Sequence, residues 1–189
     1  MASILLAGPA AEPLTLVEAK AFLRVEHDDD DLTIAALIAG SRIHVEMQTR
    51  RALITQTWRL IRDGWPEDGR IFLSPSPLQE IVAARVYDGG GETHDIDLQA
   101  FVSDKAASVI AFANWSMPLP GRPVGGIEID VRVGYGDAAS DVPEPLRQAT
   151  RLLVAHWYEN RSAPAGALPI AVTPAGVGAL IAPYRMQSL

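Results

Sequence analysis

The chain has 189 residues, a mass of 20.3 kDa and a formal net charge of −7 at pH 7. Hydrophobic residues make up 48% of it, which is typical of a globular chain, and its length fits one domain or one domain with a large insertion. Without cysteine it can form no disulfide, zinc–thiolate site or iron–sulfur cluster. The acidic balance disfavours wholesale coating of nucleic acid, because phosphate binding needs clustered cations.

The N-terminal segment, residues 1–13, has a short apolar run without a preceding positive charge, so it lacks the pattern of a signal peptide. No stretch of the sequence approaches the roughly 18 uncharged apolar residues of a membrane span, and we expect no membrane partner. We interpret residues 1–13 as a flexible N-terminal arm.

Two helices are expected in the N-terminal third. Thr15 and Glu18 have the spacing of a capping box and predict a helix over 15–25. The aspartate run at 28–31 lacks the ligand spacing of a calcium loop, and first-turn charge at the start of a helix over 30–51 explains it better. The apolar stripe of this second helix is predicted to face the core: Leu32, Ala35, Ala36, Ile38, Ala39, Ile43 and Met47.

The middle of the chain, 55–135, has the pattern of short strands. They are expected near 55–62, 71–73, 81–87, 93–97, 100–103, 107–112 and 126–134. The last of them alternates strictly between apolar and polar residues, which predicts one buried and one solvated face. Helix returns over 143–161, and 163–189 is expected to be a flexible linker and tail with one short helix.

This order of elements predicts an α+β fold. The two N-terminal helices cannot bury their apolar stripes alone, and the helix over 143–161 is the natural partner. We therefore expect a small helical bundle within one domain over 14–162, interrupted by an inserted antiparallel β region and followed by a short C-terminal helix.

No active site stands out in the sequence. The four histidines lack the spacing of metal ligands, and no serine-nucleophile motif occurs. We expect no catalytic residue, metal or cofactor. His94, Asp95 and Asp97 leave a particle-associated hydrolase open as an alternative, although a solvated loop end explains these residues better.

One segment carries an unusual charge. Residues 42–62 hold five arginines against one glutamate, a local charge of +4. A solvated face with helix-end charges is the plain interpretation, and a DNA-binding module is a second alternative. A polarised subunit could also stack head to tail on its neighbours, and on that hypothesis the candidate interface residues are Arg42, Arg50, Arg51, Trp58, Arg59 and Arg62.

Several segments, spread over about 14 to 185, match one known family. They read LTLVEAKAFLRV at 14–25, RALITQTW at 51–58, VRVGYGD at 131–137, VPEPLRQA at 142–149, LVAHWYENR at 153–161 and LIAPYR at 180–185. Together they resemble phage head–tail connector (adaptor) proteins, in the form with a β insertion found in long-tailed phages, prophages and gene transfer agents. Many members carry Gly where this chain has Arg50, so a tight left-handed exit from the second helix is less expected here.

The resemblance implies a non-enzymatic, structural role. Such adaptors form a ring of twelve copies between the portal protein and the stopper or tail-terminator protein. The ring extends the channel through which double-stranded DNA passes without sequence-specific binding, and it helps to retain and deliver that DNA. The protein would lie in the bacterial cytoplasm during assembly and then in the neck of the particle. The C-terminal segment supplies candidate portal-docking residues: Leu180, Ile181, Tyr184, Arg185 and Met186.

Overall fold

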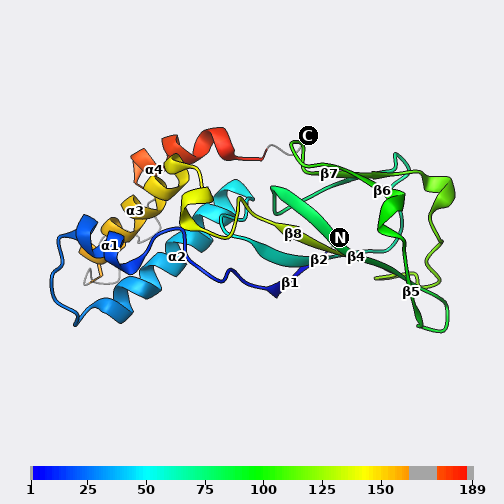
Figure 1. Ribbon diagram of the computed structural model, residues 1–189, viewed down its shortest axis with the longest axis horizontal. Helices are drawn as coiled ribbons and strands as arrows, with labels where there is room; N and C mark the ends of the chain where they lie inside the picture. Colours follow the sequence, from blue (N-terminus) through cyan, green and yellow to red (C-terminus); the bar gives the residue numbers. More distant parts are fainter. Residues whose placement is uncertain (1, 162–173, 187–189) are drawn as a thin grey trace. The chain divides into compact units, whose positions relative to one another are not determined.

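A computed structural model describes residues 2–161 and 174–186 of the chain. They form two compact units. The β unit comprises the described parts of Met1–Pro9 and Thr55–Gly134, and the helical unit those of Ala10–Ile54 and Tyr135–Leu189. The predicted α+β class is confirmed (Figure 1), and in chain order most of the antiparallel strands lie between the N-terminal and C-terminal helices.

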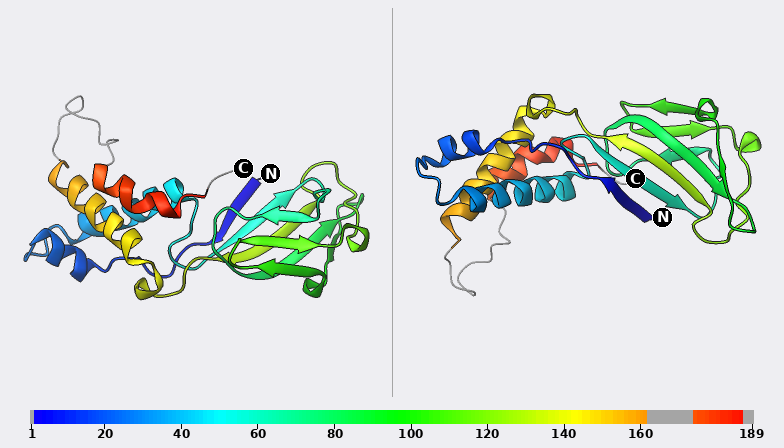
Figure 2. Two further views of the ribbon diagram at one scale, coloured as in Figure 1. Left: turned by 90° about the horizontal axis from the view of Figure 1, so that it is seen from above. Right: turned by 60° about the horizontal axis from the view of Figure 1, so that its bottom comes forward.

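The β unit contains two antiparallel sheets (Figure 2). One has the order β1-β2-β8-β4-β5 and the other the order β3-β7-β6. The strands are β1 (Ala2–Ala7), β2 (Gln56–Arg62), β3 (Arg70–Phe72), β4 (Leu78–Tyr87), β5 (Thr93–Asp95), β6 (Phe101–Asp104), β7 (Val109–Phe112) and β8 (Ile127–Val133). Every strand predicted from the sequence over 55–135 is present, and β1 is additional.

The N-terminal segment differs from its prediction as a flexible arm. Residues 2–7 form β1, which pairs antiparallel with β2, so that Ile4 lies opposite Arg59. Strand β2 pairs with β8 on one side, so its other edge has backbone groups free to pair. Strand β1 bonds to that edge, although the two strands are distant in sequence. The arm prediction is therefore wrong for these residues.

Strand β8 lies in the centre of the larger sheet, between β2 and β4. Its apolar residues are all buried, as the alternating pattern predicts: Ile127, Ile129, Val131 and Val133. Its other face is solvated only in part: Arg132 is exposed as predicted, whereas Asp130 is only 5% exposed. The cause is pairing across the sheet, where Arg59 of β2 and Arg85 of β4 both bond the Asp130 carboxylate.

The helical unit is built from α1 (Leu16–Leu23), α2 (Asp31–Thr49), α3 (Glu144–Glu159) and α4 (Ala175–Ile181). The first three begin and end within one or two residues of their predicted positions. The capping box of Thr15 and Glu18 is confirmed in both directions. Helix α3 contributes Leu146 and Leu153 to one buried cluster and Val154 to a second, so it is the shared partner of the N-terminal helices, as predicted.

Helix α2 turns a different face to the core than its sequence suggests. The buried residues are Ile34, Ile38, Ser41, Arg42, Val45 and Thr49. Only Ile38 of the predicted stripe is among them. Arg42 can be buried because Glu12 and Glu46 accept hydrogen bonds from its guanidinium group at 2.8 Å each. The helix still ends in the left-handed conformation at Arg50, with a φ of 57°, although a side chain replaces the family's glycine.

Candidate interaction site

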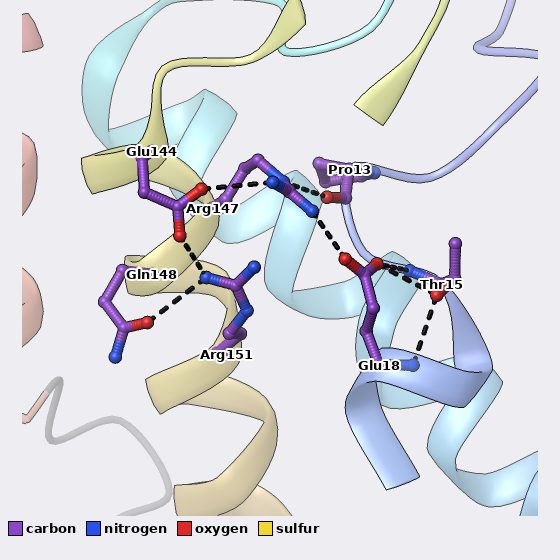
Figure 3. A network of polar contacts seen from close by, with 7 residues as sticks. All are labelled: Pro13, Thr15, Glu18, Glu144, Arg147, Gln148 and Arg151. Atoms are coloured by element: carbon purple, nitrogen blue, oxygen red, sulfur yellow. Dashed lines mark hydrogen bonds and ion pairs between the residues drawn. The ribbon is translucent and has the colours of Figure 1, made fainter. Parts of the chain in front are cut away.

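A polar network ties α1 to α3 within the helical unit (Figure 3). The guanidinium group of Arg147 donates to Glu18 at 2.7 Å, to Glu144 at 3.0 Å and to the carbonyl oxygen of Pro13 at 3.1 Å. Glu18 also accepts from the backbone N–H of Thr15, and this bond, helped by Arg147, lowers the pKa of Glu18. The network fixes the N-terminus of α1 beside the first turns of α3.

The aspartate run before α2 is occupied by internal partners. Lys20 bonds Asp28 at 2.6 Å and Asp31 at 2.7 Å. Asp30 precedes α2 as predicted but forms no side-chain cap. It accepts hydrogen bonds from Tyr158 and Arg161, which lower its pKa. Among the described residues no group of three His, Cys, Asp or Glu side chains could hold a metal ion.

The arginine candidates are divided between the two units and do not form one set. In the helical unit, Arg42 is paired internally and Arg51 donates to the carbonyl oxygen of Tyr184 at 2.7 Å. Arg50 is exposed at the end of α2. These side chains therefore do not make a single basic surface for DNA within that unit.

The β-unit candidates are also largely engaged. Arg59 bonds Asp130 at 2.7 Å and Glu128 at 3.1 Å. Trp58 lies beside Val131 on the core face and donates its ring N–H to Gln56 at 2.9 Å. Burial lowers the pKa of Arg62, whose Nε atom has no hydrogen-bond partner. Their placement favours a structural role in the sheet.

The C-terminal candidates fold back onto the helical unit. Ile181 is fully buried in the cluster that holds Leu146, and Leu180 and Tyr184 pack against it half-buried. Ile181 is thus a core residue in this structure. Arg185 is exposed and contacts Gln48, and the N–H of Met186 donates to the carbonyl oxygen of Thr49. The remaining parts of the predicted linker and tail, 163–173 and 187–189, lie outside the described residues.

The loop that supports the hydrolase alternative is open to solvent. His94 contacts Asp88 at 3.1 Å, and their side chains are 57% and 41% exposed. Asp95 is 88% exposed, and Asp97 caps the short helical turn at Leu98–Ala100. The arrangement gives none of these groups the burial that tunes a general acid or base. None of the described helices is long and apolar enough to cross a membrane.

Sequence reasoning missed the surface that stands out most. The side chains of α2 that were expected in the core leave an apolar outer face, with Leu32 89%, Met47 75% and Ile43 47% exposed. We call this surface the outer face of α2 and define it by Leu32, Ala35, Ala36, Ala39, Ile43 and Met47. The signal in the sequence was that α2 is apolar around most of its circumference, which one buried face cannot explain.

Comparison with known proteins gives matches among solved structures. No family model and no curated protein matches the sequence. A chain in the neck of an empty gene transfer agent (GTA) particle, computed with C6 symmetry, is 28% identical, with a TM-score of 0.80 over 100% of this chain and 97% of that one. A chain in the neck of a native GTA particle, computed with C12 symmetry, is 28% identical, with a TM-score of 0.73 over 98% and 97%.

A chain in the virion of a native GTA particle has the same fold, with 23% identity and a TM-score of 0.82 over 100% of this chain and 97% of that one. The similarity includes both units, because it runs the length of the chain. It confirms the resemblance that the sequence segments indicate: this chain is similar, over its whole length, to a component of the gene transfer agent neck.

Proposed function

We propose that this chain is a structural head–tail connector subunit in the neck of a phage-like particle. One observation carries the proposal: the match to a GTA neck chain at 28% identity covers 100% of this chain and 97% of the other. A shared fold alone would not indicate a shared role. Similarity over both units, with no large segment left over on either side, supports the same place in a particle.

In this proposal twelve copies form a ring between the portal protein and the stopper or tail-terminator protein. The C12 symmetry of one similar neck structure supports that number. The ring extends the channel for double-stranded DNA and helps to retain and deliver it. A net charge of −7 suits a channel in which DNA slides, because phosphates are not attracted to an acidic protein. The subunit is made in the bacterial cytoplasm, joins the neck during assembly and catalyses no reaction.

The two alternatives gain no supporting observation. A DNA-binding module needs accessible clustered cations, whereas Arg42 and Arg59 are bonded to carboxylates within their own units. A hydrolase needs positioned acid and base groups, whereas His94 and Asp95 lie exposed on the short strand β5.

Quantitative mass spectrometry of purified tailed particles from the source tests the proposal. We expect this chain in a near-equal ratio to the portal protein, with the major head protein as the loading reference. Reconstruction of the particle neck should then place the chain directly below the portal. Absence from mature particles, or only a trace amount, contradicts the proposal.

A further inference from the structure

The six members of the outer face of α2 are all uncharged, along about four turns of helix. At about 100° per residue they lie within a sector of about 120°. Glu46 falls in the same sector, but its side chain is only 15% exposed and pairs with Arg42. Ser41 is buried on the opposite side of the helix, and Arg42 and Thr49 are buried on its flank. An exposed helix face of this composition is unusual for a helix that packs on a core with its other side.

The apolar surface extends beyond the helix itself. A cavity of about 320 Å³ opens beside Ala35, and Leu14, Leu16 and Ile38 contribute to its largely apolar wall. Contiguous exposed apolar surface on a soluble protein marks a site of association. The outer face of α2, with this hollow at one side, therefore has the character of a contact surface.

The nature of the partner follows from symmetry and charge. Similar chains occur in necks computed with C6 and C12 symmetry, where copies repeat around an axis. Each copy of this chain carries a net charge of −7, so charged surfaces of neighbouring copies would on average repel each other. Exposed side chains without charge, such as the members of the outer face of α2, allow close contact between copies without that cost.

A contact that closes a ring joins two different surfaces of the same chain. The chain supplies a second set of exposed apolar side chains outside the helical unit. Trp115 is 91% exposed and Leu119 87% exposed, in the segment between β7 and β8. Large aromatic residues are the usual anchors of protein interfaces. Each copy thus carries apolar surface on both of its units.

We propose that the outer face of α2 is a contact surface for a neighbouring copy of this chain. The proposal rests on the proposed ring and identifies one of the surfaces that hold it together. It makes Leu32, Ile43 and Met47 interface residues in place of the arginines that sequence analysis favoured.

Charge substitution on the face tests the proposal in particles. Ile43→Glu and Met47→Glu change exposed side chains, so the subunit should keep the circular dichroism spectrum and unfolding midpoint of the wild type. We expect the abundance of each variant in particles, relative to the portal protein, to be at least about tenfold below that of the wild type. The reason is that the new charge would be buried against the neighbour. Thr33→Glu, on the same helix but outside the face, is the matched control and should be incorporated like the wild type.

A photo-crosslinking residue at position 47 identifies the partner directly. Irradiation of particles should give a product of twice the subunit mass that contains peptides of this chain alone. A product with another neck protein, or no product between chains, overturns the proposal. So does normal incorporation of Met47→Glu while the wild type is present at the portal ratio, and that result leaves the proposed function intact. Absence of the wild type from particles overturns both.

Discussion

Strand β8 and helix α2 depart from the amphipathic rule in opposite directions. On the polar face of β8, Asp130 is only 5% exposed, whereas on the apolar outer face of α2 Met47 is 75% exposed. The charge of Asp130 is balanced within the β unit by Arg59 and Arg85. The helical unit leaves apolar surface that no described residue of that unit covers. Polarity alone therefore does not decide which face of a strand or helix is buried, because the available partners decide it too.

The charge network on β8 persists because the partners of Asp130 are well placed. Burial alone would raise the pKa of Asp130, but hydrogen bonds from Arg59 and Arg85 outweigh it and hold that pKa below its ordinary value. Glu128 contacts the same two arginines at 3.1 Å and 3.6 Å. Two carboxylates and two guanidinium groups thus compensate one another on this face of the sheet.

In the β unit, the substitution Asp130→Ala is expected to lower the unfolding free energy most. It leaves Arg59 and Arg85 with Glu128 as their remaining close partner in the network, and breaking a buried ion pair costs about 3–5 kcal/mol of unfolding free energy. Urea unfolding of the full chain measures the loss. The control is Glu80→Gln, which breaks the exposed Glu80–Arg132 pair and should cost under about 1 kcal/mol. Equal losses in the two variants would show that the ion pairs of Asp130 contribute no more than an exposed pair.

The helical unit allows a matched test of buried against exposed apolar side chains. Ile181→Ala should lower the unfolding free energy by about 3 kcal/mol, because Ile181 is fully buried. Met47→Ala removes a comparable volume from the outer face of α2. It should change the unfolding free energy by less than about 0.5 kcal/mol. Far-ultraviolet circular dichroism during urea unfolding follows the helices that carry both residues.

This pair also tests the role of the C-terminal segment. If α4 were a free docking tail, Ile181→Ala would be as neutral as Met47→Ala. For the same reason, removal of residues 174–189 should destabilise the helical unit, since Val177 and Ile181 belong to its core. A truncated chain that keeps wild-type stability would contradict the packing of α4.

Local signals in the sequence were enough to place most elements. The capping box at Thr15 and Glu18 placed α1, and the alternation over 126–134 placed β8. Strand β1 was missed because residues 2–7 do not alternate between apolar and polar residues. Its formation depends on β2, which lies about fifty residues further along the chain.

The candidate site was harder to predict than the fold, since it depends on contacts between distant residues. The excess of arginine over 42–62 suggested a basic surface, but Arg42 pairs with Glu12 and Arg59 with Asp130. Neither partner is close in sequence to its arginine. Helix α2 carries apolar residues on both sides, so periodicity could not distinguish the core face from the outer face.

The last prediction concerns the flank of α2 that faces α3. Gly40 lies in mid-helix, and a Cβ atom there would be 3.5 Å from the ring of Trp157, an ordinary van der Waals distance. Gly40→Ala should therefore raise the unfolding free energy by about 1 kcal/mol, from the higher helix propensity of alanine.

The matched control is Gly178→Ala in α4, where the added methyl group meets nothing within 4 Å. Both variants gain the same propensity, so the difference between them isolates the contact with Trp157. A loss of stability in Gly40→Ala alone would mean that α2 and α3 pack more closely than described. Packing would then require glycine at position 40, because only glycine would fit between the two helices. The outer face of α2 would be the side of the helix where substitutions leave the stability of the subunit unchanged.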